Sequence, residues 1–124
     1  MTPQDVLRIL TSHERWLNQQ PGGSRANLTL ADLHGASMAE SNLRAAKLSG
    51  ANLARAVLRG SDLQEADLFA ANLDRADLTN TNLFRTDLRG AYLRGAKLKG
   101  ANLKEADLRG GTLLNASKKE GLQV

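Results

Sequence analysis

Few residues of this chain are suited to catalysis or to metal binding. The histidines are His13 and His34, and cysteine is absent from all 124 residues. Neither histidine belongs to a serine–histidine–acid arrangement or to a metal-ligand spacing, and the carboxylates are distributed along the whole chain. Without cysteine, disulfides, thiolate metal sites and cysteine nucleophiles are excluded. The sequence therefore predicts a protein that is not an enzyme and that has no cofactor and no metal.

Cations and aromatic rings form the remaining candidate site, which would bind a partner protein. Basic side chains recur at five-residue intervals near the C-terminal end, and the only two phenylalanines fall in the same phase of that interval. A cation above an aromatic ring makes a favourable contact. The candidate partner-binding residues are Phe69, Phe84, Arg89, Arg94, Lys99, Lys104 and Arg109.

These residues must be positioned by a repeat of five residues. A leucine, with Met38 as the one exception, occupies every fifth position, and Ala, Ser, Thr or Gly stands two residues before each. A helix repeats every 3.6 residues and a strand every two, so neither would align the leucines. They align if the chain turns once per unit, and they then form the core. The predicted core residues are Leu28, Leu33, Met38, Leu43, Leu48, Leu53, Leu58, Leu63, Leu68, Leu73, Leu78, Leu83, Leu88, Leu93, Leu98, Leu103, Leu108 and Leu113.

The units resemble those of a known family. Ala51-Asn52-Leu53, Ala66-Asp67-Leu68, Ala76-Asp77-Leu78 and Ala101-Asn102-Leu103 are similar to the A(D/N)LXX repeat of pentapeptide repeat proteins, and the resemblance covers 90 of 124 residues. It implies an all-β fold, a right-handed quadrilateral parallel β-helix in which four units make one coil. Residues 20 apart would then lie above one another, with coils separated by about 4.8 Å.

The N-terminal residues follow a different pattern, typical of a helix. Thr2 is suited to be the N-cap, Pro3 to be the first helical residue, and Asp5 to complete a capping box. Apolar residues then recur at helical spacing until about Gln20. We expect a capping helix and linker over residues 1–24, a β-helix of about 4.5 coils over 25–116, and a tail over 117–124. The alternative is a helix that docks a partner, which an exposed Trp16 would favour.

The 20-residue register predicts several contacts on the surface. Arg89 and Arg109 should neutralise the stacked Asp87 and Asp107. Arg89 should lie over Phe69. The same register places Lys104 over Phe84. It also forms one column from Asn42, Asp62, Asn82 and Asn102, in which stacked amide side chains can pair with one another. Glycines at the last position of a unit, such as Gly35 and Gly90, indicate type II turns.

The five basic residues would surround the last coil as a collar. A collar fits a solvated rim or an acidic protein partner, whereas a nucleic-acid groove favours a one-sided stripe with interleaved aromatics. The net charge of +4 permits an anionic partner without requiring one.

Three functions remain open from the sequence. The first is a rigid protein-interaction scaffold. The second comes from the resemblance, since some family members linked to quinolone resistance mimic DNA and bind DNA gyrase, but that mimicry needs an acidic surface and this chain is basic. The third is a structural element that forms a homodimer or stacks end to end through its poorly capped C-terminal end. No leader or membrane-spanning stretch is evident, so we expect a cytoplasmic location and no membrane partner.

Overall fold

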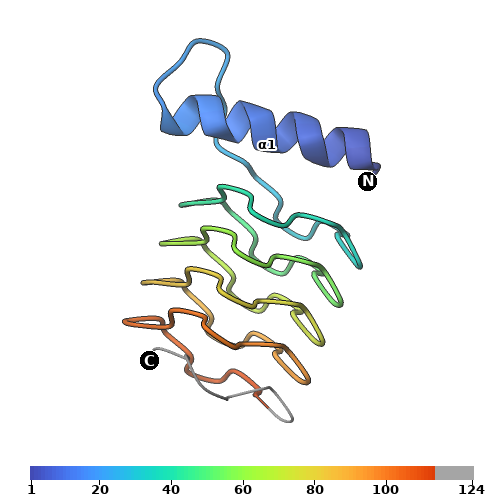
Figure 1. Cartoon of the computed structure of the whole chain (residues 1–124), viewed down its shortest axis with the longest axis vertical. Coiled ribbons are helices and arrows are strands. Elements are labelled where there is room, and N and C mark those ends of the chain that lie inside the picture. Colours follow the sequence, from blue (N-terminus) through green and yellow to red (C-terminus); the bar gives the residue numbers. More distant parts are fainter. Residues whose placement is uncertain (114–124) are drawn as a thin grey trace.

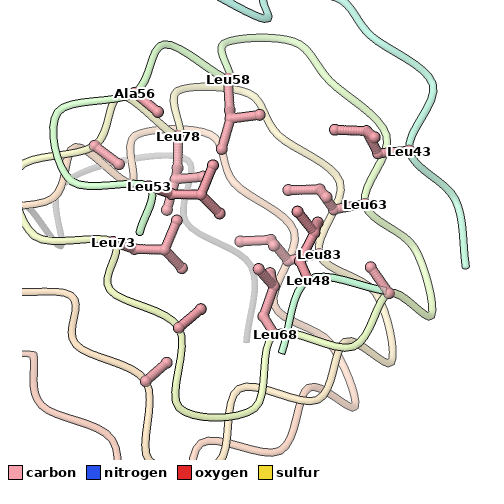
Figure 2. Packing of buried hydrophobic residues seen from close by; sticks show 14 of the residues in the cluster. Leu43, Leu48, Leu53, Ala56, Leu58, Leu63, Leu68, Leu73, Leu78 and Leu83 are labelled. Atoms are coloured by element: carbon pink, nitrogen blue, oxygen red, sulfur yellow. The ribbon is translucent and has the colours of Figure 1, made fainter. Parts of the chain in front are cut away.

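The leucines of the repeat fill the interior of a stacked coil. In the computed structural model, which describes residues 1–113, the side chains of this column point inward from the surrounding backbone (Figure 2). All but the last two, Leu108 and Leu113, are at most 5% exposed, and Met38 occupies the same position with 2% exposure. Most of the alanines beside them are buried as well, and Ala31, Ala36 and Ala106 are partly buried. A larger side chain at these positions would overpack the core. The predicted core is thus buried from Leu28 to Leu103, and Leu108 and Leu113 are partly buried against it.

Parallel pairing with a register of 20 residues joins the coils. Each described bridge links residue i to residue i+20, from Asn27 with Lys47 to Tyr92 with Thr112. At the first bridge, the Lys47 N–H donates to the Ala26 carbonyl at 3.0 Å, and the Leu28 N–H donates to the Lys47 carbonyl at 2.7 Å. Within residues 1–113 each strand is reduced to a single bridge residue. The fold is the predicted right-handed quadrilateral β-helix, seen as a vertical stack in Figure 1.

A tight turn closes every unit at its corner. The Leu28 carbonyl accepts the Ala31 N–H at 3.0 Å, and the residue at the last position of the unit has a positive φ, 67° at Gly35. Both features agree with the predicted type II turn. Among residues 1–113, ten corners carry a residue other than glycine in this left-handed conformation, with φ between 54° and 61°: Leu30, Glu40, Ala45, Arg55, Glu65, Ala70, Arg75, Asn80, Arg85 and Glu105.

Hydroxyl groups replace some of the buried alanines and bond to the coil above. The hydroxyls of Ser61 and Thr81 each donate to a backbone carbonyl at 2.8 Å, to Met38 and Leu58 respectively, and that of Thr86 donates to Leu63 at 2.9 Å. Each is at most 1% exposed. A buried hydroxyl without a partner would be costly, so these contacts are what allows a polar side chain in this column.

Helix α1 (Pro3–Leu17) begins as predicted and ends earlier. The Thr2 hydroxyl accepts the Asp5 N–H at 3.1 Å, and Asp5 accepts the Thr2 N–H at 2.9 Å, which completes the capping box. The helix ends at Leu17 rather than near Gln20, because Gln19 takes a φ of 56°. The Gln20 N–H then bonds the Arg15 carbonyl at 2.8 Å, as in a Schellman motif. No helix among residues 1–113 has the length and apolar character needed to cross a bilayer.

Helix α1 lies across the N-terminal end of the stack and caps it (Figure 1). Val6, Ile9 and Leu10 pack against the core. Two residues of the predicted helical pattern are instead exposed: Leu7 by 65% and Trp16 by 39%. Helix α1 therefore caps the stack, and it also exposes Trp16, the feature that favours docking of a partner. The predicted boundary at residue 116 and the tail 117–124 lie outside the described residues.

His13 joins α1 to the first coil and is fully buried. Its Nδ1 accepts the Ala26 N–H at 2.9 Å, so Nε2 carries the proton and donates to the Arg44 carbonyl at 2.8 Å. In lower coils the carbonyl at that position accepts an N–H from the coil above, as Gln64 does from Ala45. His13 therefore supplies the hydrogen bonds that a further coil would otherwise make.

Substituting a corner residue tests the cost of the left-handed turns. We expect Ala70→Gly, at a φ of 56° and an exposed position, to raise the free energy of unfolding by about 0.5–1 kcal/mol, because glycine adopts this conformation without steric cost. Urea denaturation measures the change. Ala54→Gly, one position before a corner, is the control and should destabilise. Equal destabilisation by both variants would contradict the strain argument.

Acidification should weaken the docking of α1. Burial lowers the pKa of His13 below its ordinary value of 6.5, against the hydrogen bond to Arg44, which raises it, and the nearby Arg25 charge lowers it further. The stabilisation from neutral His13 is thus complete above about pH 6.5 and is lost as the pH falls through the lowered pKa. Trp16, whose ring stacks on His13 at 5.5 Å, reports the change by fluorescence.

The histidine on the exposed surface supplies the control for that titration. We expect His34→Ala to retain the acid transition and His13→Ala to abolish it while destabilising the cap. An unchanged transition in the His13 variant would assign it to another group.

Candidate functional site

The seven candidate residues occupy the same position of their units, directly after the leucine. The register distributes them over the four sides of the rod, which we number by the first leucine or methionine: side 1 from Leu28, side 2 from Leu33, side 3 from Met38 and side 4 from Leu43. Side 1 carries Phe69, Arg89 and Arg109; side 2 carries Arg94; side 3 carries Lys99; and side 4 carries Phe84 and Lys104. The basic residues therefore surround the C-terminal part of the rod as a collar.

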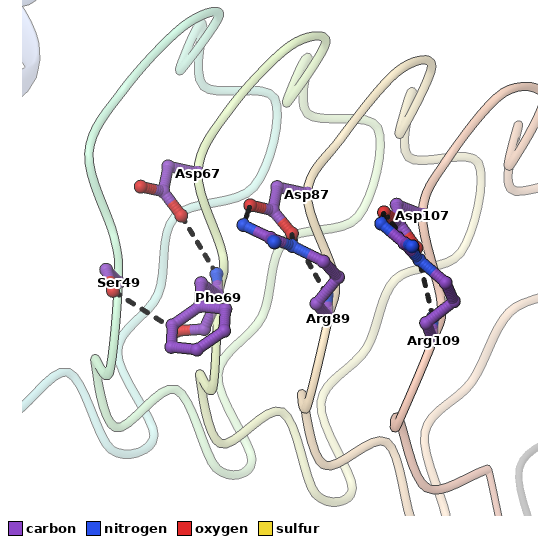
Figure 3. Close-up of polar contacts among 7 residues, drawn as sticks. All are labelled: Ser49, Asp67, Phe69, Asp87, Arg89, Asp107 and Arg109. Atoms are coloured by element: carbon purple, nitrogen blue, oxygen red, sulfur yellow. Dashed lines mark hydrogen bonds and ion pairs between the residues drawn. The ribbon is translucent and has the colours of Figure 1, made fainter.

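Phe69 and two arginine–aspartate pairs form the most ordered surface of side 1 (Figure 3). The Arg89 guanidinium lies 5.2 Å from the centre of the Phe69 ring, as predicted. Its Nε and Nη2 donate to Asp87 at 2.9 and 2.8 Å. The hydrogen bond from Arg89 holds the pKa of Asp87 below its ordinary value. Phe69 nevertheless remains 45% exposed, so its outer face is available for contact.

The same arrangement recurs one coil below. Arg109 donates to Asp107 through Nε at 2.9 Å and through Nη2 at 2.6 Å. This hydrogen bonding lowers the pKa of Asp107 to about 2, and a backbone hydrogen bond from Arg109 adds to the effect. The predicted neutralisation of the aspartate column by arginines is confirmed. At Arg89 and Arg109, side 1 therefore presents paired rather than free charges.

Phe84 is covered by a different cation from the one predicted. Arg85, the next residue, places its guanidinium 5.0 Å from the Phe84 ring, whereas the prediction assigned this contact to Lys104. Arg85 is at a corner with a φ of 54°, and it also pairs with Glu105 at 3.4 Å. The register fixes which residues share a column, but a long side chain at the adjacent corner reaches the ring as well.

The remaining collar residues differ in how their charge is used. Arg94 bonds Asp74 of the coil above at 2.6 and 3.0 Å and lies 5.7 Å from the Tyr92 ring, which is 46% exposed. The hydrogen bond from Arg94 lowers the pKa of Asp74. Among residues 1–113, Lys99 and Lys104 form no ion pair. The collar is therefore less cationic than its sequence indicates, since its three arginines are neutralised.

Comparison with known proteins identifies this repeat. A family model described as pentapeptide repeats matches in eight copies, over residues 24–44, 36–73 and 71–110. The chain belongs to the pentapeptide repeat family. None of the curated proteins compared with it matches.

Solved structures of other pentapeptide repeat proteins share the fold. One, from the thylakoid lumen of Arabidopsis thaliana, is 25% identical with a TM-score of 0.74, and the match covers 77% of this chain and 66% of the other. Rfr23 from the cyanobacterium Cyanothece 51142 is 33% identical with a TM-score of 0.74, over 75% of this chain and 63% of the other. This pentapeptide repeat chain thus spans just under two thirds of the length of these two relatives.

The polar column of side 4 does not form the predicted amide ladder. Instead the side-chain oxygen of Asn42 accepts the N–H of Arg44 at 3.3 Å, and that of Asn102 accepts the N–H of Lys104 at 3.0 Å. Asp62 and Asn82 bond the backbone two residues later in the same way. Asn and Asp side chains readily satisfy a local backbone donor. This family position therefore stabilises the turn of its own unit.

Neither histidine of the pentapeptide repeat chain is arranged for catalysis. His34 is exposed, as expected, and both nitrogens of His13 are engaged by backbone groups. Within residues 1–113 no three His, Asp or Glu side chains gather as a metal site would require. Sequence reasoning missed the role of His13, for which its helical spacing with Leu10 and Leu17 was the only signal.

A titration of Asp107 tests the pairing on side 1. We expect a carboxyl midpoint near 2 by NMR, and a return toward 3.8 in Arg109→Gln, because the neutral amide pairs less strongly with the carboxylate. The stabilisation is present above the ordinary value and is lost as the pH falls toward 2. Arg55→Gln, at a distant corner, is the control. A midpoint unaffected by the Arg109 substitution would refute the pairing.

Proposed function

We propose that this protein is a non-enzymatic interaction rod that binds a partner protein through Phe69 and the residues around it. The observation that carries the proposal is the fixed position of an exposed aromatic ring. Arg89 covers one side of the Phe69 ring, and Asp87 holds Arg89 through two hydrogen bonds. Large aromatic and arginine side chains dominate binding energy at protein interfaces. A ring already held in place loses little conformational entropy on binding.

The rest of the collar would extend this contact. Phe84 adds a second ring on side 4, and Arg94 and Arg109 are held by their own aspartates. Lys99 and Lys104 provide charges that an acidic partner can neutralise, which favours association rate and orientation more than affinity. We infer an acidic protein surface as the partner, since the two lysines are the free cations among the described collar residues.

Several observations support a role without catalysis. Within residues 1–113 the interior of the rod is packed with leucine and alanine side chains. His13 is committed to the capping contacts. The carboxylates with resolved shifts all have lowered pKa values, whereas a general acid near neutral pH needs a raised one.

The other two functions have less support. DNA mimicry toward gyrase would need an acidic surface, and this chain has a net charge of +4. Self-association through the C-terminal end concerns residues beyond the described range. A DNA supercoiling assay and sedimentation at several concentrations test these two proposals directly.

Affinity capture with matched variants tests the interaction rod. From an extract of the source cells, we expect Phe69→Ala/Phe84→Ala to retain at least tenfold less of the partner than wild type, because an interface hot spot is worth about 2 kcal/mol or more. Phe69→Ala alone should account for most of the loss, since Phe84 is only partly exposed.

The exposed ring on side 2 provides the control. Tyr92→Ala removes a ring that is 46% exposed, close to the 45% of Phe69, and should leave the captured set unchanged. Thermal melts verify that all variants remain folded. Identical captured sets for wild type and the folded double variant would exclude this surface as the binding site.

A further inference from the structure

A groove separates the N-terminal half of α1 from the first coil, at the opposite end from the collar. Its volume is about 340 Å³. Apolar side chains of the helix form one wall, and residues of sides 2 and 3 form the other. The helix crosses above the coil here (Figure 1). The lining of the groove includes Val6, Leu7, Leu10, Asp32, Leu33 and His34.

The floor of the groove is an open β edge. In the second coil, the Asn52 N–H donates to Ala31, the Asn52 carbonyl accepts from Leu33, and the Ala54 carbonyl accepts from Gly35. The equivalent groups of the first coil are the N–H and carbonyl of Asp32 and the carbonyl of His34. None of these three has a hydrogen-bond partner among residues 1–113. The backbone of α1 forms no hydrogen bond with any of the three.

His13 forms hydrogen bonds only on other sides of the first coil. Its two hydrogen bonds reach Arg44 and Ala26, on sides 4 and 1. Side 2 therefore keeps one donor and two acceptors at the spacing of a β-bridge. A set of this kind is complementary to an extended main chain, which pairs by strand addition.

The side chains of the groove indicate the sequence of such a segment. Leu7 is 65% exposed, although the nearby helix residues Val6 and Leu10 are partly buried against the core. An apolar side chain entering the groove would cover it. Asp32 accepts the His34 N–H through Oδ1 and forms no ion pair among the described residues. Its charge is complementary to a lysine or arginine beside the apolar residue.

We propose that this groove binds an extended peptide segment of a partner protein. The segment adds to side 2 as the strand of a further coil, with an apolar residue against Leu7 and a basic residue at Asp32. The site is independent of Phe69 and the collar, so either site can fail its test without affecting the other.

Selection from a phage-displayed library of random octapeptides tests the proposal on the full chain. We expect enriched peptides to pair an apolar residue with a lysine or arginine. Bound peptide should slow the exchange of the Asp32 amide at least tenfold by NMR. N-methylation of the peptide residue that donates to the Asp32 carbonyl should remove binding.

Matched variants locate the bound peptide. Leu7→Ala and Asp32→Asn should each weaken binding about tenfold, whereas Leu30→Ala, which truncates a leucine that is 78% exposed outside the groove, should not. Since Leu7 and Asp32 are exposed, these variants are expected to fold, which the His13–Trp16 fluorescence verifies. The proposal is overturned if no clone enriches, or if the peptides bind Leu7→Ala as tightly as wild type. It is also overturned if sedimentation shows a dimer that Leu7→Ala dissociates, since the occupant would then be a second copy.

Discussion

Every coil depends on a corner turn in which the last residue of a unit has a positive φ. The turn lets the leucine carbonyl accept the N–H of the following small residue, and it redirects the chain by one side of the rod. Without it, leucines five residues apart would point in different directions. The repeat therefore tolerates ten left-handed residues other than glycine, each with a steric cost, because the leucine interior and the pairing between coils offset it.

The rigidity of the backbone gives the surface its order. Residues 20 apart are held one coil apart by parallel bridges, so side chains meet neighbours at fixed separations. Arg94 reaches Asp74 vertically, whereas Arg89 and Arg109 reach aspartates within their own units. Each of the rings of Phe69, Phe84 and Tyr92 is covered by an arginine side chain that is long enough to reach it. These contacts place an arginine against each exposed ring, which is a favourable starting point for binding another protein.

Features that depend on the periodicity were predicted correctly from the sequence. Predictions failed where a contact depends on the conformation of a single side chain. The leucine period, the corner conformation and the Thr2-Pro3 helix start follow from local rules. The helix end was misplaced because Gln19 takes the conformation usually given to glycine. The contact on Phe84 was assigned to Lys104 because column position says nothing of the reach of Arg85. The role of His13 required knowing which coil carbonyl lacked a partner.

The fixed register also limits how such a chain can change in length. Insertion of one residue would move every later leucine out of the interior, so tolerated changes come in whole units of five. A five-residue change keeps the core but transfers every later side chain to the next side of the rod. Only a change of 20 residues, one full coil, preserves both the core and the alignment of each side. Growth by duplication of whole coils would lengthen the rod while preserving the surfaces at both ends.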